Sequence, residues 1–226
     1  MSTLTEAWPW AARSPLPGRG WCRPAMASGV GNFLGESLSL PDRDSSCMST
    51  KSYAIQVPAA GVPDPVLARR ATGADEDVLS RLWLLFQHHM SAWSGELPAT
   101  DGTYRSEWLD RALSEPGWNA WLLTAGVHPI GLALTRAMND PVRVLNTFFL
   151  VAPVRGRGLG RAFAHAVVAD TPGKWSVAFQ DLNRVAAGFW PRVAAAWDPG
   201  WSMEHRPVQG RPDSAPDSWV TFTVRA

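Results

Sequence analysis

The order of strand-like and helix-like stretches constrains the fold of this chain more than any other feature. Short turns join three consecutive strand-like runs, which predicts an antiparallel meander: Trp118–Thr124, Ile130–Met138 and Val142–Val151. A helix-like stretch over Gly160–Ala169 then separates the third run from a strand-like run at Trp175–Phe179. A strand–helix–strand crossover of this kind adds a parallel pair to an otherwise antiparallel sheet. The sequence therefore predicts an α/β (α+β) fold with a mixed, mostly antiparallel twisted sheet and helices on both faces.

The remaining elements are read from caps and periodicity. Val66–Ala71 alternates as a half-buried strand does, and Thr72 with Asp75 forms a capping box that predicts a helix ending near Gly95. A second, short helix is expected to begin at Thr103 and to stop at Glu115-Pro116-Gly117. The last elements are a helix from Asn183 to about Val193 and late strands that end in Trp219–Val224.

Residues 1–65 differ in composition from the rest of the chain. They contain eight Pro, six Gly and nine Ser and show no sustained period of 2 or 3.6. This composition predicts a disordered or poorly ordered extension, 1–65, before one domain, 66–226. Met48 resembles a second translation start, which leaves open whether residues 1–47 belong to the native protein. The alternative is a tail that docks a partner through Trp8, Trp10 and Trp21.

The charge balance and the cysteine count exclude several classes of protein. Lys and Arg number 21 against 20 Asp and Glu, so nucleic acid and anionic membranes, which reward clustered cations, are not expected as partners. The longest apolar run, Leu82–Phe86, is far too short to cross a bilayer, and the N-terminus does not resemble a secretory signal. We therefore expect a cytoplasmic protein. Two cysteines support neither a disulfide framework nor a zinc site, and no metal is expected.

The glycine-rich stretch Arg155-Gly156-Arg157-Gly158-Leu159-Gly160-Arg161 lies between a predicted strand and a predicted helix. Glycines let the backbone bring unpaired N–H groups close to an anion, and a helix N-terminus favours negative charge. The stretch therefore predicts a phosphate-binding loop. It does not fit the dinucleotide fingerprint G-x-G-x-x-G/A, and no Walker sequence occurs, because Gly173-Lys174 is followed by Trp175.

Two spaced motifs resemble the GNAT superfamily of acyl-CoA-dependent N-acetyltransferases. The first is Arg155-x-x-Gly158-x-Gly160, and the second is Asn183-x-x-Ala186, which lies 28 residues after Arg155. The predicted order of strands and helices is also the order that this superfamily uses. The resemblance covers roughly residues 66–226 and implies a GNAT-like fold.

The resemblance also implies a binding mode for acetyl-CoA, the acyl donor. The pyrophosphate of coenzyme A would lie on the backbone amides of Gly156, Arg157, Gly158, Leu159, Gly160 and Arg161, with Arg155 adding positive charge. The pantetheine arm would run beside Phe149, Leu150 and Val151, where the family's parallel strands separate. Asn183 would hydrogen-bond this arm from the other side.

The catalytic acid and base are not identified by the resemblance. Trp190 stands where many members have a tyrosine that protonates the leaving thiolate, and Ala178 stands where ribosomal-protein acetyltransferases have a glutamate. Other members use a glutamate on the strand before the loop, where this chain has Asn146 and Thr147. The proton either leaves through ordered water or passes to an acceptor-side residue, for which the candidates are Asp181, His89 and Glu96. Trp93 and Trp190 are candidate substrate-binding aromatics.

The sequence thus predicts an enzyme that transfers an acetyl or other acyl group from acetyl-CoA to a primary amine, by direct attack in a ternary complex. A small-molecule amine is the first choice of acceptor, and a peptide or protein amine is the second. A non-catalytic acyl-CoA-binding regulatory module and a nucleotide-binding module remain alternatives. The exposed part of the late strands could pair across a two-fold axis, so a homodimer is a further possible partner arrangement.

Overall fold

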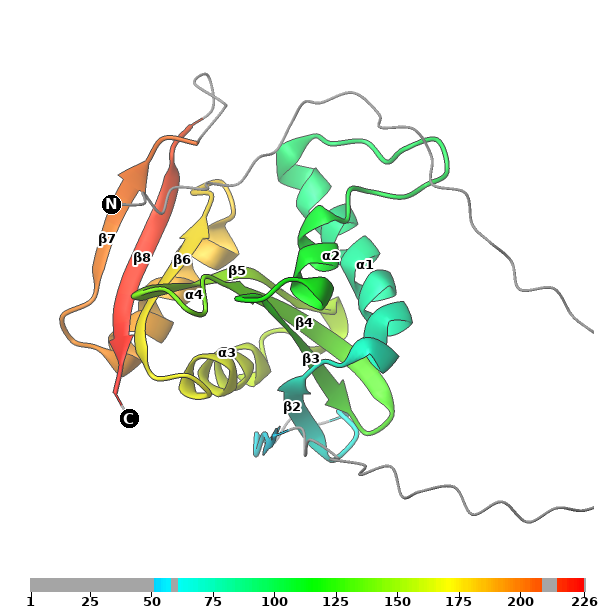
Figure 1. Ribbon diagram of the computed structural model, residues 1–226, viewed down its shortest axis with the longest axis horizontal. Coiled ribbons are helices and arrows are strands. Elements are labelled where there is room, and N and C mark those ends of the chain that lie inside the picture. Colours follow the sequence, from blue (N-terminus) through cyan, green and yellow to red (C-terminus); the bar gives the residue numbers. More distant parts are fainter. Residues whose placement is uncertain (1–50, 58–60, 209–214, 226) are drawn as a thin grey trace, which may run out of the picture. The chain divides into compact units, whose positions relative to one another are not determined.

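An eight-stranded sheet forms the centre of the protein in the computed structural model, which describes residues 51–57, 61–208 and 215–225 (Figure 1). Its spatial order is β1-β2-β3-β4-β5-β6-β8-β7. The strands are β1 (Ser52–Ala54), β2 (Val66–Arg70), β3 (Asn119–Ala125), β4 (His128–Arg136), β5 (Val142–Leu150), β6 (Gly173–Phe179), β7 (Ser202–Arg206) and β8 (Asp217–Val224).

The pairing within this sheet confirms the predicted mixed, mostly antiparallel topology. Neighbouring strands from β1 to β5 pair antiparallel, and so do β6 with β8 and β7 with β8. The pair β5–β6 is parallel. A helix connects these two strands, as a parallel pair requires.

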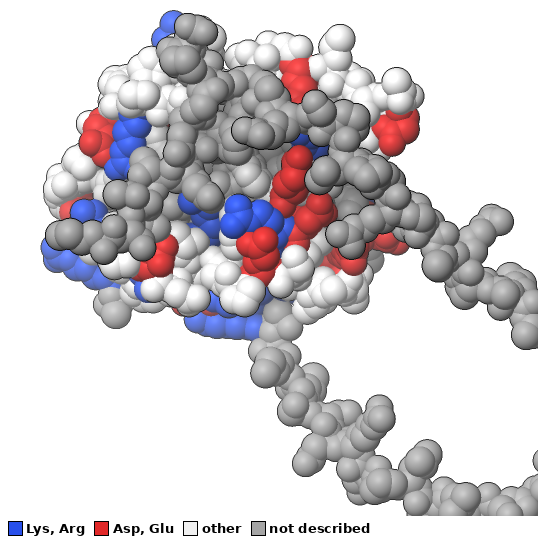
Figure 2. All heavy atoms as spheres, turned by 45° about the horizontal axis from the view of Figure 1, so that its top comes forward, with Lys and Arg blue, Asp and Glu red and all other residues white. Residues whose placement is uncertain are grey.

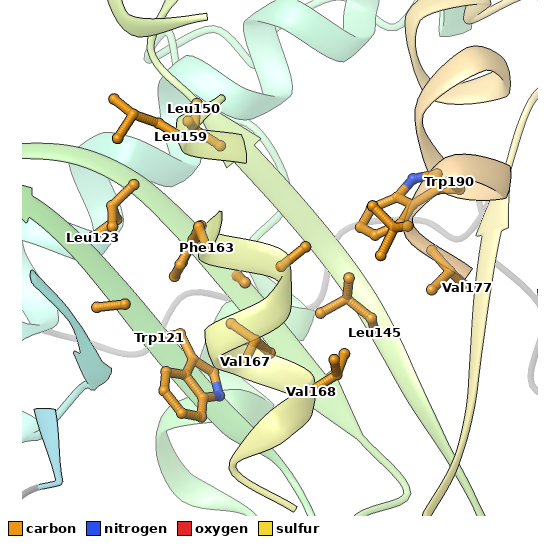
Figure 3. Packing of buried hydrophobic residues seen from close by; sticks show 14 of the residues in the cluster. Trp121, Leu123, Leu145, Leu150, Leu159, Phe163, Val167, Val168, Val177 and Trp190 are labelled. Carbon is orange, nitrogen blue, oxygen red and sulfur yellow. The ribbon is translucent and has the colours of Figure 1, made fainter. Parts of the chain in front are cut away.

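Four α-helices in the described part of the chain cover the two faces of the sheet (Figure 1). Their bounds are α1 Glu76–Ser94, α2 Glu107–Ser114, α3 Leu159–Ala169 and α4 Arg184–Trp197. The first two pack with Leu122, Leu132 and Phe149 on what we call the α1–α2 face. The other two pack on what we call the α3–α4 face, where Phe163 and Val167 of α3 and Trp190 of α4 lie against strand residues such as Trp121 and Leu145 (Figure 3). Helices therefore lie on both faces, as predicted.

The start of α1 is fixed by the predicted capping box. The backbone N–H of Thr72 donates to Oδ2 of Asp75 at 2.8 Å, across a short 3₁₀ turn at Gly73–Asp75. Arg69 donates two further hydrogen bonds of 2.7 Å to the same carboxylate. Together these donors lower the pKa of Asp75 to about 2, with the bonds from Arg69 as the largest cause. Gly95, in the left-handed conformation, ends α1 at the predicted position.

Two predicted helix ends are wrong. Helix α2 begins at Glu107 and not at Thr103, because Asp101 holds Thr103 in a turn. The backbone N–H and the hydroxyl of Thr103 both donate to the Asp101 carboxylate, at 3.0 and 2.7 Å. Helix α4 continues to Trp197, beyond Val193, since Val193 and Ala194 are still buried against the sheet.

The ordered structure also begins before the predicted boundary at residue 66. Strand β1 pairs antiparallel with β2, and its Tyr53 hydroxyl donates to Asp170 at 2.6 Å. Arg70 donates to the same carboxylate at 3.0 and 2.5 Å, and Lys51 lies 3.6 Å from it. This carboxylate at the end of α3 accepts hydrogen bonds from Tyr53 and Arg70 and forms an ion pair with Lys51, and so it attaches residues 51–54 to the sheet. The expectations for residues 1–50, including Met48 and the two cysteines, lie outside the described residues.

The charged side chains on the visible face in Figure 2 are mixed, with Lys and Arg lying among Asp and Glu. Within the described part of the chain, no helix is both long enough and apolar enough to span a bilayer.

We expect replacement of Tyr53 by Phe to destabilise the protein at neutral pH by about 1.5 kcal/mol, because a hydrogen bond to a charged carboxylate is lost. Burial raises the pKa of Asp170, but the bonds from Tyr53 and Arg70 outweigh it and hold the pKa below its ordinary value. The contribution is therefore complete above about pH 4, the ordinary pKa of Asp, and is lost as the pH falls through the lower folded-state pKa. Chemical denaturation of wild type and Tyr53→Phe between pH 7 and pH 2.5 measures this difference.

The matched control is Tyr104→Phe, which removes the hydroxyl of the chain's other tyrosine. It should leave the unfolding free energy within about 0.5 kcal/mol of wild type. A loss in Tyr53→Phe that persisted unchanged at pH 2.5 would show that the Asp170 carboxylate is not its cause.

Candidate functional site

A cleft opens where the two parallel strands separate. The strands β5 and β6 pair from Val142–Lys174 only as far as Leu145–Val177. On the other side of β5, the register with β4 shifts, so that Asn146 forms a bulge between Leu145 and Thr147. A bulge bends its strand and increases the local twist, and here it occurs at the residue after the last parallel pair. The strands consequently diverge, with Trp190 of α4 next to Leu145 and Val177 (Figure 3).

The cleft measures about 530 Å³, its open mouth included, and reaches both faces of the sheet. Residues of α1 and of α4 both contribute to its walls. The lining residues are Phe86, Met90, Leu145, Asn146, Phe148, Val177, Ala178, Phe179, Gln180, Asn183, Ala186, Trp190 and Asp217. Nine of the thirteen lining residues are apolar, and the polar side chains are those of Asn146, Gln180, Asn183 and Asp217.

The glycine-rich loop has the backbone geometry of an anion-binding turn. Gly156 and Gly158 have φ values of 73° and 80°, in the left-handed region, and Gly158 is the N-cap residue of α3. The first hydrogen bond within α3 runs from the backbone N–H of Ala162 to the Gly158 carbonyl, at 3.1 Å. The three preceding amides, of Leu159, Gly160 and Arg161, therefore lack acceptors within the helix.

Space around the loop is limited on one side. A Cβ atom on Gly158 would lie 3.3 Å from Cγ1 of Val57, in the segment that follows β1. A Cβ atom on Gly160 would be in ordinary contact with Phe189, at 3.6 Å. A side chain at Gly158 is thus disfavoured by the φ value and by the close approach of Val57, but a Cβ atom is tolerated at Gly160.

The three arginines of the loop differ in their surroundings. Arg157 and Arg161 are exposed beside the glycines. Arg155, expected beside the phosphate, instead donates from Nε to the Leu150 carbonyl at 2.7 Å and lies over the Phe149 ring at 5.3 Å. Its Nη1 is also 3.2 Å from Nε2 of His89. Arg155 therefore connects the loop to the end of β5 and to α1.

Asn183 lies in the cleft wall at the start of α4. Its Oδ1 accepts a hydrogen bond of 3.1 Å from the backbone N–H of Ala186, so the side chain caps the helix. The cap explains the spacing of the second sequence motif, since the accepting amide lies three residues on. The side-chain NH₂ group is left as the donor that Asn183 can offer to a ligand.

Trp190 belongs to an aromatic wall on the α3–α4 face of the cleft. It is 5% exposed, and its ring is 5.3 Å from Phe148 in an edge-on arrangement. Phe189 stacks on Phe148 at 5.8 Å. Trp190 therefore lines the cleft at the position where the resemblance leads one to expect a tyrosine.

None of the three candidate catalytic residues is among the described residues that line the cleft. Asp181 is exposed and accepts a hydrogen bond of 2.6 Å from Ser218, and it lies 3.3 Å from His205. Glu96 pairs with Arg105 at 3.1 Å.

His89 lies at the end of β5, with Trp93 edge-on at 4.8 Å and Phe149 at 6.1 Å. Burial, and then the charge of Arg155, lowers the pKa of His89 below its ordinary value, so its imidazole is neutral at pH 7. Trp93, the other candidate aromatic, thus touches His89.

The sequence motifs missed the polar group contributed by β8. Asp217 is 3% exposed and lines the cleft beside Gln180, which follows β6. It lies two residues before Trp219, whose side chain packs with Ala178 and Val144 in a small cluster of buried residues. An acidic residue at an inward position of a strand pattern is the signal that could have found it. The described residues contain no group of three side chains suited to hold a metal ion.

Comparisons with known proteins identify the fold. No protein-family model and no curated protein matches the sequence. Among solved structures, an acetyltransferase from Thermus thermophilus has a TM-score of 0.53 at 19% identity, over 72% of this chain and 99% of that one. A spermidine N-acetyltransferase from Vibrio cholerae, in complex with CoA and spermine, has a TM-score of 0.50 at 13% identity, over 70% and 95%. An aminoglycoside N(6′)-acetyltransferase from Legionella pneumophila has a TM-score of 0.50 at 14% identity, over 70% and 91%.

These similarities confirm the predicted architecture. The chain has the fold of the GNAT acetyltransferases, with a mostly antiparallel sheet between helices. At these identities the comparison concerns the fold alone.

We expect Asn183→Ala to lower the unfolding free energy by about 1 kcal/mol, because the N-cap acceptor of α4 is lost. Asn183→Asp keeps a carboxylate oxygen in the same place and should keep the stability of wild type, while it removes the NH₂ donor. Thermal denaturation of the two variants measures the cap separately from any ligand contact. Equal stability of the alanine variant and wild type would contradict the role of Asn183 as a cap.

Proposed function

We propose that this protein is an N-acetyltransferase that moves an acetyl group from acetyl-CoA to a primary amine. The observation that carries the proposal is the position of the cleft: it begins where β5 and β6 separate and is lined by Asn183 at the start of α4. The glycine-rich loop follows β5 and begins α3. The fold shared with acetyltransferases, among them one in complex with CoA, supports this assignment.

Acetyl-CoA would be held by the groups that converge on the α3–α4 side of the cleft. The backbone amides of Gly156, Arg157, Gly158, Leu159, Gly160 and Arg161 suit a pyrophosphate, with the positive end of the α3 dipole behind them. The pantetheine arm would lie in the gap beside Phe149, Leu150 and Val151. There the separated strand offers backbone groups that β6 no longer pairs, and the Asn183 NH₂ group can donate from the opposite wall.

The reaction proposed is direct attack of the amine on the thioester. The amine nitrogen forms a bond to the carbonyl carbon, and the carbon–sulfur bond breaks. The acceptor begins as an ammonium ion and loses two protons overall: one is taken up by the departing thiolate and one passes to solvent. A backbone N–H of β5 aimed at the carbonyl oxygen would stabilise the charge that develops there.

Of the three candidate bases, His89 is best placed, because it lies against Phe149 and is neutral at pH 7. In this structure, however, Nη1 of Arg155 lies 3.2 Å from Nε2 of His89 and, as a donor, takes up the lone pair with which His89 would accept a proton. We therefore propose that water in the cleft takes the proton, unless Arg155 turns toward the bound phosphates and frees His89. Asp181 and Glu96 are engaged with Ser218 and Arg105 and are weaker candidates.

The acceptor proposed is a small-molecule amine. Two of the solved structures with this fold act, by their names, on an aminoglycoside and on spermidine, both small amines. A peptide or protein amine is the second choice.

The phosphate-binding loop is tested by Gly160→Asp and its matched control Gly160→Ala. A Cβ atom is tolerated at this position, since its nearest neighbour, in the Phe189 ring, would lie 3.6 Å away. A carboxylate in the first turn of α3 favours the free helix by about 0.3–1 kcal/mol but repels a bound pyrophosphate. We expect Gly160→Asp to keep or raise the melting temperature while it weakens CoA binding, measured by calorimetry, by roughly tenfold or more. Gly160→Ala should bind within about threefold of wild type. Equal affinity of the two variants would place the phosphates elsewhere.

Turnover separates the enzyme from a non-catalytic acyl-CoA-binding module. With acetyl-CoA bound, we expect free thiol to appear at a rate that depends on added amine, across a panel that includes spermidine and an aminoglycoside. CoA binding without amine-dependent thiol release over the whole panel would favour the regulatory module. Saturable binding of ATP or NAD that CoA does not displace would favour a nucleotide-binding module.

A further inference from the structure

The cleft connects the two faces of the sheet, and the groups on the two sides differ. On the α3–α4 face its walls come from residues such as Val177, Phe179 and Trp190, which belong to the large core on that face. On the α1–α2 face they come from Phe86 and Met90 of α1. Under the function proposed above, the donor occupies the α3–α4 side, so the acceptor must enter from the α1–α2 side.

Asp217 lies on the acceptor side. In a strand, residues two apart face the same way, so Asp217 shares its face with Trp219. Trp219 packs with Ala178 and Val144, which lie on the face opposite Val177 and Leu145 of the large core. Ala178 pairs with Trp219 across the strands, which places Asp217 next to Gln180 at the carboxyl end of β6. Asp217 is thus at the edge of the gap where the reacting carbonyl would lie.

Asp217 is also the one ionisable side chain among the described residues that line the cleft. It is 3% exposed. The other polar side chains in the described wall are the neutral amides of Asn146, Gln180 and Asn183. A carboxylate in such a wall attracts a cation that enters the cleft more strongly than an exposed carboxylate would, because less water screens the pair.

We propose that Asp217 binds the ammonium group of the acceptor and so makes the protein select cationic primary amines. The inference rests on the proposed function and names the residue that recognises its second substrate. Asp217 accepts a hydrogen bond from the amine nitrogen and holds it beside the thioester. Acceptors whose amine is uncharged at neutral pH, such as anilines, are bound less well.

The test needs no knowledge of the natural acceptor. In the tetrahedral adduct the amine nitrogen is two bonds from the coenzyme sulfur, and in S-(2-aminoethyl)-CoA an ammonium nitrogen is three bonds from it. S-propyl-CoA has the same number of atoms in its chain but no charge. We expect wild type to bind the aminoethyl derivative roughly ten- to a hundredfold more tightly than the propyl derivative, as a charge-assisted hydrogen bond implies.

The variant Asp217→Asn should remove this preference while it keeps the affinity for S-propyl-CoA. The matched control is Glu204→Gln on the neighbouring strand β7, an exposed carboxylate that does not line the cleft. It should keep the full preference for the aminoethyl derivative. Circular dichroism and the melting temperature of each variant establish that it is folded.

The possible outcomes separate the two proposals. If wild type binds both derivatives equally, the role of Asp217 is overturned, and this result does not depend on whether Asp217→Asn folds. A preference that survives in folded Asp217→Asn, or disappears in Glu204→Gln, also overturns it. If neither derivative nor CoA itself binds, the proposed function fails, and this inference fails with it.

Discussion

The separation of β5 from β6 is the constraint on which the rest of the site depends. Four residue pairs hold the parallel strands together, and the bulge at Asn146 then turns β5 away. Beyond that point each of the two strands still pairs on its outer side, but the backbone groups that face the gap have no partner strand. Unpaired backbone groups are costly in a buried position. A sheet can keep such a gap open when helices support both strands from each side. Here Phe86 of α1 and Trp190 of α4 fill that role, and they leave a cleft between them.

The same topology brings two helix N-termini to one edge of the sheet. Carboxyl ends of parallel strands point the same way, so the segments that follow β5 and β6 emerge together. The first becomes the glycine-rich loop and α3, and the second becomes α4, which Asn183 caps. Ligands of open sheets bind at such a position, outside the carboxyl ends of strands whose connections diverge. The positive ends of two helix dipoles near one cleft favour an anionic ligand.

Much of this arrangement was predictable from the sequence, because its signals are local. The meander and the crossover helix follow from periodicity and turn signals. The glycine-loop and asparagine motifs were found through their resemblance to a known superfamily, and the two motifs lie within about 30 residues of each other. Strand β1 was not predicted, since three residues without a pattern of their own are ordered by Asp170, more than 100 positions away. Arg155 shows the same limit: its motif position indicates a phosphate, while its hydrogen bond to Leu150 and its contact with His89 depend on where α1 packs. Asp217 lies in the wall of the cleft because β8 pairs with β6, and the order of elements along the chain does not reveal this pairing.

The proposed reaction includes two proton transfers, protonation of the leaving thiolate and deprotonation of the amine, and the wall of the cleft bears on which of them the protein must assist. A thiol has an ordinary pKa of about 8.5, so a thiolate can leave from a thioester without an acid beside it. An alkylamine, like lysine with a pKa of about 10.4, is almost wholly protonated at neutral pH and cannot attack until it loses a proton. A buried tryptophan in place of a tyrosine on the donor side, at Trp190, therefore costs the proposed reaction little. The demand falls on the acceptor side, where Asp217 is the ionisable side chain in the described wall and His89, whose pKa is lowered, lies at the end of β5. Together, the apolar donor wall and the carboxylate opposite it favour a reaction whose selectivity is set by how the amine is held.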